Sequence, residues 1–197
     1  MRRKYGFTLV EVLFVVLIAG SVLAFAVPAY KRMQERGDYH AALGNLLALG
    51  NAANSLKRDL KLNTGVSITT VPTSGSYIQY GGTNWATKAP STTAEKKQSW
   101  NQYVVSQGTD ANTRKAFIWA LTEFEYLKPL TNTKGYSFYL LNGTSTNAAV
   151  KQCKSPTNSA KKPIACMLKS GTKKDCYLGA VMLEEGSVER LKGTDCK

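Results

Sequence analysis

The chain has 197 residues, of which 43% are hydrophobic, and a formal net charge of +13. This length accommodates one domain with an appendage and excludes two full domains of ordinary size. The sequence has one histidine, His40, and no H-E-x-x-H, G-x-S-x-G or phosphate-loop motif, so we expect neither an enzyme nor a cofactor.

The N-terminus combines a basic leader, residues 1–6, with an apolar segment, residues 7–29. The apolar segment is 23 residues long and contains a single charged residue, Glu11. As a helix it would be about 34 Å long at ~1.5 Å per residue, enough to cross a hydrocarbon core of roughly 30 Å. The sequence therefore predicts one membrane-spanning helix followed by a soluble domain.

An ordinary secretory signal peptide is the alternative interpretation of this N-terminus. Ala24-Phe25-Ala26 offers an A-x-A cleavage pattern after a basic start and an apolar core. However, a carboxylate inside the apolar run is costly in a membrane, and the run continues into a helical pattern after Tyr30. These features favour a retained helix over a secreted domain, enzymatic or not, that loses its signal peptide.

The segment Gly6-Phe7-Thr8-Leu9-Val10-Glu11, followed by the long apolar stretch, resembles the type IV pilins and type II secretion pseudopilins. The resemblance implies that a prepilin peptidase cuts between Gly6 and Phe7 and that the new amino terminus of Phe7 is methylated. It also implies a homo-oligomeric helical filament, built by a pilus assembly machinery from subunits held in the inner membrane and then displayed on the cell surface.

Glu11 has no basic residue between Phe7 and Tyr30 to neutralise it. A buried carboxylate must be protonated or find a cation, and the freed amine of Phe7 is the cation at similar depth. The pair could form within one helix or with the amine of a neighbouring subunit, and the resemblance implies the second, which couples neutralisation to docking. A third interpretation is a glutamate merely tolerated near the membrane surface.

Gly20 and Pro28 are expected to loosen the apolar helix. Glycine lowers helix propensity by ~1 kcal/mol relative to alanine, and proline removes a backbone donor. The helix can therefore bend or lose a turn between them, and filament packing in the resembled family uses such loosening. A simple kink tolerated in a membrane is the alternative.

The apolar pattern becomes amphipathic in residues 30–62. Apolar residues such as Leu46, Leu56 and Leu60 recur at helical steps between charged residues, which predicts that the same helix continues and packs one face on a globular head. Asn63-Thr64-Gly65 is a fitting stop, and His40 is expected on the surface.

The rest of the chain, residues 63–197, is predicted to form the globular head. Residues 64–115 are rich in Thr, Ser, Gly and Asn and predict a loose connection with a short strand or helix. Residues 117–127 and 136–141 are aromatic and predict an antiparallel hairpin, and residues 176–183 predict another strand before a turn. The predicted fold class is α+β, a long N-terminal helix packed on an antiparallel sheet.

All four cysteines, Cys153, Cys166, Cys176 and Cys196, lie in the last quarter of the chain. None forms a C-x-x-C pair, so zinc and other metals are not expected, and an even number in an exported domain predicts two disulfides with three open connectivities. Nearest-neighbour pairing would close loops of modest size. By resemblance, Cys176–Cys196 is the counterpart of the C-terminal disulfide loop of pilins.

The positive charge is concentrated near the C-terminus. Leader removal lowers the net charge from +13 to +10, and residues 151–174 contain seven lysines and no acidic residue. This Lys-rich segment favours an adhesive or simply solvated surface over weak DNA binding of the kind expected in a DNA-uptake pilin. The function expected overall is a structural subunit of a type IV pilus. A type II secretion pseudopilin and a minor pilin share the N-terminal motif and are the competing hypotheses.

Overall fold

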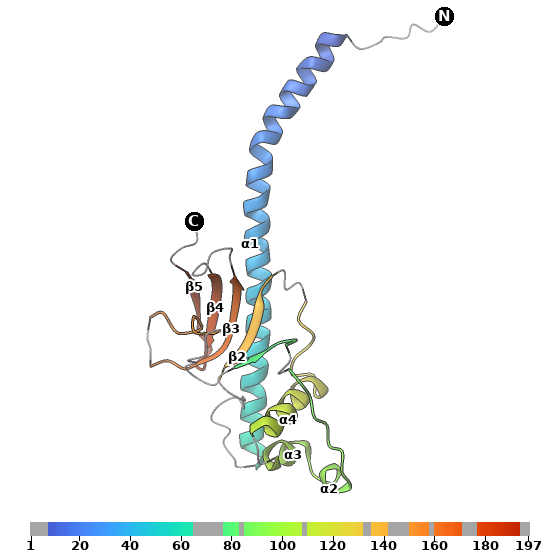
Figure 1. Ribbon diagram of the computed structural model, residues 1–197, viewed down its shortest axis with the longest axis vertical. Helices are drawn as coiled ribbons and strands as arrows, with labels where there is room; N and C mark the ends of the chain where they lie inside the picture. Colours follow the sequence, from blue (N-terminus) through green and yellow to red (C-terminus); the bar gives the residue numbers. More distant parts are fainter. Residues whose placement is uncertain are drawn as a thin grey trace, which may run out of the picture. The chain divides into compact units, whose positions relative to one another are not determined.

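The computed structural model describes residues 8–64, 77–82, 85–107, 110–131, 135–141, 150–157, 160–170 and 177–193. Its first helix, α1 (Leu9–Thr64), passes through two compact units, residues 1–40 and 41–197, which are called the N-terminal and C-terminal units below (Figure 1). Each unit is described by itself. The predicted long N-terminal helix is confirmed.

In the N-terminal unit the structure describes Thr8 and the first part of α1. Its side chains are exposed from Thr8 to Gly37, and His40 is exposed as well, as predicted. Pro28 lies inside the helix. Proline has no N–H to donate to the preceding turn, which removes one helical hydrogen bond. Figure 1 shows that the blue part of α1 is bent rather than straight.

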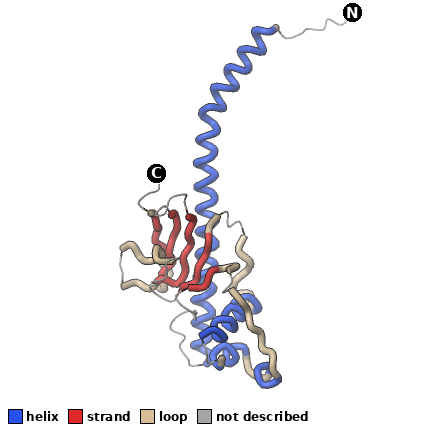
Figure 2. Tube along the Cα trace, viewed as in Figure 1, coloured by secondary structure: helices blue, strands red, loops and turns tan. Residues whose placement is uncertain are grey.

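The C-terminal unit contains a five-stranded antiparallel sheet in which every strand pairs with its neighbour in sequence (Figure 2, red). The strands are β1 (Tyr77–Gln79), β2 (Ser137–Leu141), β3 (Pro163–Ser170), β4 (Tyr177–Leu183) and β5 (Val188–Lys192). Strands that alternate buried side chains between two faces need a cover on each face. The two covers are different elements of the chain.

The second half of α1 covers one face of the sheet. A β-carbon on Gly50 would lie 2.2 Å from Sδ of Met182 on β4, so helix and strand approach closely there. Met182 aligns with Ala165 of β3, which places both side chains on this face. The helix contributes a buried apolar stripe, Ala42, Leu46, Leu49, Ala53, Leu56 and Leu60, each 0% exposed. The apolar side of the amphipathic pattern predicted for this part of the helix is therefore the side that is buried.

Residues 150–157 cover part of the opposite face. A disulfide joins Cys153 in this segment to Cys166 in β3, with their Cα atoms 5.8 Å apart. The cluster around it consists of Tyr139, Leu141, Val150, Leu168, Val181, Leu183 and Leu191, all buried. A disulfide that closes a loop of this size stabilises a fold by about 3 kcal/mol. The sheet thus has an apolar core on each side.

Three further helices follow β1 in the C-terminal unit (Figure 2, blue). They are α2 (Thr93–Lys96), α3 (Trp100–Ser106) and α4 (Asp110–Glu123). Thr92 and Glu95 form a capping box at the start of α2, which satisfies backbone donors in an otherwise exposed turn. The segment after α4 is tied to α1 by a hydrogen bond from the Tyr126 hydroxyl to the Asp59 carboxylate. Burial, followed by this bond, raises the pKa of Tyr126 to about 12.

The sequence predictions for the head are partly wrong. β2 and β4 confirm the strands predicted over 136–141 and 176–183. The strand predicted over 117–127 is instead the end of α4 and the turn after it, and the loose connection contains β1 and most of the three short helices. The Lys-rich segment, predicted to be surface, contains the central strand β3. Its apolar run, Pro163 to Leu168, is buried.

Gly179 of β4 is a position where a side chain should be destabilising. A β-carbon there would lie 2.1 Å from the backbone oxygen of Met167 on β3, and backbone cannot move aside as a flexible side chain can. We expect Gly179→Ala to lower the free energy of unfolding by about 2 kcal/mol. Gly44→Ala is the matched control, because apart from the helix's own backbone and neighbouring residues this exposed glycine of α1 has nothing within 4 Å of its β-carbon position. It should raise stability by about 1 kcal/mol.

Denaturant titration of the detergent-solubilised full chain, followed by tryptophan fluorescence, measures both effects. Equal midpoints for Gly179→Ala and the unmodified chain would contradict the close approach of β3 and β4. All three tryptophans, Trp85, Trp100 and Trp119, belong to the C-terminal unit, so the signal reports on its unfolding.

Candidate assembly site

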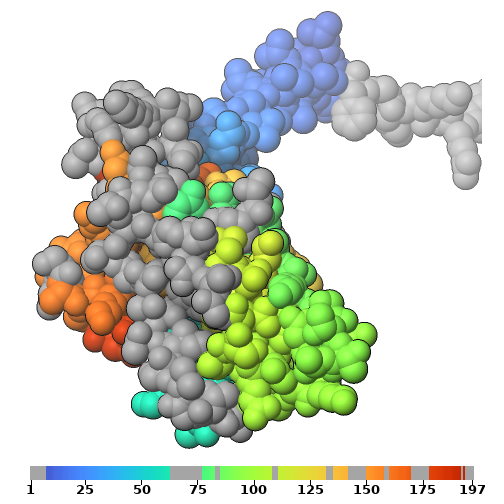
Figure 3. All heavy atoms as spheres, turned by 60° about the horizontal axis from the view of Figure 1, so that its bottom comes forward, coloured from blue at the N-terminus to red at the C-terminus, as the bar shows by residue number. Residues whose placement is uncertain are grey.

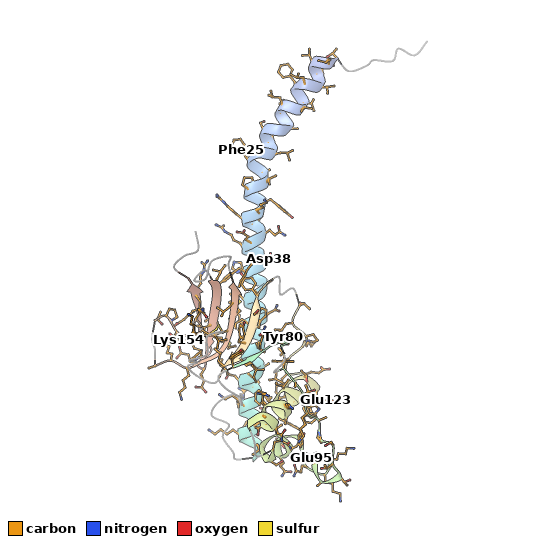
Figure 4. The ribbon with its side chains drawn as sticks, viewed as in Figure 1. Phe25, Asp38, Tyr80, Glu95, Glu123 and Lys154 are labelled. Carbon is orange, nitrogen blue, oxygen red and sulfur yellow. A yellow bond between two sulfur atoms is a disulfide. The ribbon has the colours of Figure 1, made fainter. Side chains whose placement is uncertain are left out.

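The first half of α1 presents an uncovered apolar surface. Its large hydrophobic side chains from Leu9 to Val27 are between 49% and 81% exposed. Phe25, 80% exposed, projects away from the helix axis (Figure 4). A surface of this kind is much larger than the apolar patches that monomeric soluble proteins expose, so it marks contact with a membrane or another protein. By length and composition, α1 is also apolar enough to cross a membrane.

Glu11 is held at the start of this surface by Thr8. The backbone N–H and the hydroxyl of Thr8 both donate to Oε2 of Glu11, at 2.8 and 2.9 Å, and the N–H of Glu11 donates to Oγ1 of Thr8 at 3.3 Å. This reciprocal arrangement is a capping box, in which two otherwise unpaired donors of the first helical turn are satisfied. Glu11 therefore caps the start of α1 through hydrogen bonds made within a single subunit.

The capping box gives Glu11 a role that sequence reasoning from its charge missed. The pattern is visible in the sequence, because Thr8-Leu9-Val10-Glu11 is an S/T-x-x-E pattern directly before an apolar run. The two roles are compatible. A carboxylate accepts about four hydrogen bonds, and Thr8 supplies two, so the cap leaves room for a cation at the same group.

Gly20 and Pro28 lie within a continuous helix. Apart from the neighbouring residues and backbone of the helix itself, no atom lies within 4 Å of the β-carbon position of Gly20, so a side chain there would meet no other described segment. Next to it, the hydroxyl of Ser21 donates to the carbonyl of Ile18 at 2.8 Å. Side-chain bonds of this kind offer the carbonyl a second donor and often accompany helix bending. The predicted loosening at Gly20 and Pro28 stays a prediction about the filament.

Four predicted site residues, Gly6, Phe7, Cys176 and Cys196, lie outside the described residues. Cleavage at Gly6, methylation of Phe7 and the second disulfide therefore stay predictions. Of the three connectivities left open, the structure selects one that joins Cys153 to Cys166. Among the residues that the structure describes, no group of three or more His, Cys, Asp or Glu is placed to hold a metal ion.

The Lys-rich segment is only partly available as a basic surface. Lys161 forms an ion pair with Glu185 at 2.6 Å, and the ammonium of Lys169 lies 5.4 Å from the ring centre of Tyr136. The ion pair raises the pKa of Lys161, because its charged form donates to Glu185. These contacts use two of its lysines within the C-terminal unit, and DNA binding stays a prediction.

Comparison with known proteins finds a family model and curated proteins that match part of the chain. The model of the prokaryotic N-terminal methylation motif matches residues 1–27. Type II secretion system core protein G of Vibrio cholerae serotype O1 is 41% identical over 59 residues, which are 30% of this chain and 40% of that protein. The protein of the same name from Aeromonas hydrophila is 38% identical over 58 residues, which are 29% of this chain and 41% of that protein.

The match covers about two fifths of the length of these curated relatives. No solved structure matches the chain significantly. The methylation motif, the similarity to the two secretion proteins and a long N-terminal helix whose second half packs on an antiparallel sheet are consistent with one another. The chain is therefore similar, over part of its length, to the prokaryotic N-terminal methylation motif and to type II secretion system core protein G.

Proposed function

We propose that the chain is the precursor of a structural subunit of a type IV pilus, which polymerises through the first half of α1. The observation that carries this proposal is the row of exposed apolar side chains from Leu9 to Val27, capped by a single carboxylate at Glu11. Such a helix is stable in a membrane and equally suited to pack among copies of itself. The same segment can therefore anchor the subunit in the membrane before assembly and form contacts in the filament afterwards.

The proposal divides the chain by task. Residues 1–6 are a leader removed by a prepilin peptidase, and residues 7–29 anchor the subunit in the inner membrane and then form the filament core. Residues 30–62 continue the helix to the head, residues 63–197. The disulfide between Cys153 and Cys166 supports an extracytoplasmic head, because disulfides persist in oxidising compartments.

A type II secretion pseudopilin is the second candidate. It is favoured by the names of the two similar proteins, both core protein G of such a system. That similarity covers about 30% of this chain, so it leaves most of the chain unmatched. A minor pilin shares the same N-terminal features, and the abundance of the chain in purified filaments distinguishes it from a major subunit.

Deletion of the gene in the native cell separates these candidates. A pilus subunit predicts loss of cell-surface filaments in electron micrographs and recovery of the chain in the filament fraction of the wild type. A pseudopilin predicts that surface filaments remain, while folded proteins accumulate in the periplasm instead of the medium. Enzyme activity of the head, with neither defect, would contradict both.

The mature chain is expected to begin at methylated Phe7. The physical reason is that Gly6 joins the basic leader directly to the apolar helix, with Thr8 and Glu11 closing the first turn behind it. Intact-mass measurement of the membrane-bound protein should therefore give the mass of residues 7–197 plus one methyl group. An N-terminus just after Ala26 would instead identify an ordinary signal peptide and contradict the filament proposal.

A further inference from the structure

The end of α4 carries three residues that each go against the preference of their position. Glu123 is the last helical residue, where the negative end of the helix dipole disfavours a carboxylate. Glu125 has a φ of +54°, a left-handed conformation that favours glycine or asparagine. Phe124 between them is 42% exposed. We call residues 123–125 the acidic knuckle.

Contacts inside the subunit do not account for the acidic knuckle. In the part of the chain that the structure describes, the carboxylates of Glu123 and Glu125 have no ion-pair or hydrogen-bond partner. The ring of Phe124 rests against Trp100 and Trp119, with centroid distances of 5.0 and 5.5 Å, so it is held in place although it is exposed. Residues that break local rules without a local gain are expected at functional surfaces.

A basic counterpart lies in residues 150–157, which we call the basic turn. Lys151 and Lys154 are exposed there, and neither has an ion-pair partner within the described residues. The backbone around them is fixed by the disulfide of Cys153 to β3 and by a hydrogen bond from Ser155 to Glu189 of 2.6 Å. The basic turn therefore presents two lysines from a rigid base.

The acidic knuckle and the basic turn lie on opposite sides of the C-terminal unit. Figure 4 shows Glu123 at the side of α4 and Lys154 at the far side of the sheet. In Figure 3 the yellow-green helices and the orange segment that includes the basic turn likewise occupy opposite flanks of the visible face. Complementary patches on opposite sides of one subunit cannot meet within it. Between copies they make a head-to-tail contact, which repeats into a ring or a helical filament.

We propose that the acidic knuckle of one copy docks on the basic turn of another copy in the filament. This inference rests on the proposed function, because the filament brings the two surfaces together. In the contact Glu123 and Glu125 face Lys151 and Lys154, and the exposed ring of Phe124 packs against the aliphatic stems of the lysines. Charge complementarity of this kind fixes register and partner more than it adds affinity, which the apolar helices supply.

Charge reversal in the native cell tests the contact. One variant carries Glu123→Lys with Glu125→Lys, and the other carries Lys151→Glu with Lys154→Glu. Each alone should lower the yield of sheared filaments about tenfold at equal membrane levels, because like charges then face each other. Lys96→Glu with Lys97→Glu is the matched control. Both lysines are exposed around the end of α2, and their reversal should leave the yield within about twofold.

Co-expression of the two variants gives the decisive result. In a mixed filament the reversed knuckle of the first variant faces the reversed turn of the second, and the unmodified turn and knuckle also match. The proposal therefore expects a filament yield close to that of the wild type, with both variants in equal amounts, although each variant alone gives only about a tenth of that yield. Misfolding of either variant cannot produce this rescue.

Carbodiimide cross-linking of wild-type filaments adds a direct measurement. Mass spectrometry should find peptides that join Glu123 or Glu125 to Lys151 or Lys154 of another chain. Wild-type yields from both reversal variants, or filaments without these cross-links, would overturn the contact while leaving the proposed function intact. Cross-links from the acidic knuckle to a different protein would overturn it as well. A wild-type chain that builds no filaments would overturn the proposed function, and the filament contact with it.

Discussion

Glu11→Val is expected to abolish filaments while the subunit still enters the membrane. The substitution removes a carboxylate from an apolar segment, so insertion should be at least as favourable as in the wild type. Assembly should fail because the amine of Phe7 would lose its counter-charge inside a packed filament, and an unpaired buried charge is strongly destabilising. Immunoblots of sheared filaments, normalised to membrane-bound subunit, measure the loss.

The capping box allows the charge of Glu11 to be separated from its hydrogen bonds. Glu11→Gln keeps an oxygen that can accept from the N–H and hydroxyl of Thr8 but carries no charge. If the charge directs assembly, Glu11→Gln should fail like Glu11→Val. If the cap is what matters, Glu11→Gln should assemble and Thr8→Ala should fail.

Glu11→Asp provides an intermediate case, because it keeps the charge but draws it back by one methylene group. We expect a filament yield between those of the wild type and Glu11→Val. Equal yields from wild type and Glu11→Val at equal membrane levels would contradict any role of Glu11 in assembly. They would favour a glutamate that is merely tolerated near the membrane surface.

Removal of the first half of α1 is the second change with an all-or-none expected effect. A fragment of residues 31–197 should be soluble and monomeric, because it lacks the exposed apolar side chains from Leu9 to Val27 that drive assembly. It keeps the buried stripe of α1 between Ala42 and Leu60, so the core of the C-terminal unit is preserved. Sedimentation analysis should give the mass of one chain at micromolar concentration.

The full chain in detergent is the matched comparison for this fragment. After removal of detergent it should associate, whereas the fragment should stay monomeric and unfold at a similar denaturant concentration when tryptophan fluorescence is followed. Filaments formed by the fragment alone would contradict the role assigned to residues 7–29. A fragment that fails to fold would show that the first half of α1 contributes to the head.

Much of α1 could be predicted from the sequence, because its determinants are local and periodic. An unbroken apolar run of helical length, followed by Leu46, Leu56 and Leu60 at helical spacing, is legible without any partner segment. The same holds for Glu11, the one charge in the run. Its capping box is equally local, since Thr8 and Glu11 are three residues apart, yet reasoning from charge alone did not reveal it.

The short helix α4 shows where periodicity becomes ambiguous. Among its buried positions, 114, 117, 118 and 121 follow helical spacing, but the first of these four is Arg114, which does not look like a core residue. The remaining run, Phe117 to Leu121, is short, aromatic and apolar, and such runs fit a strand as well as a buried helix. Packing within the C-terminal unit favours the helix over the strand for this run.

The sequence by itself determined the N-terminal apolar helix, its single charge and an even set of cysteines, because these depend on composition and local spacing. Only the tertiary structure showed that β3 lies at the centre of the sheet. The lysines of the surrounding segment had predicted a surface location for it. Only it selected Cys166 as the partner of Cys153, because β3 brings that cysteine to the sheet face that residues 150–157 cover. Contacts between segments distant in the chain depend on strand order and register, which local patterns do not encode.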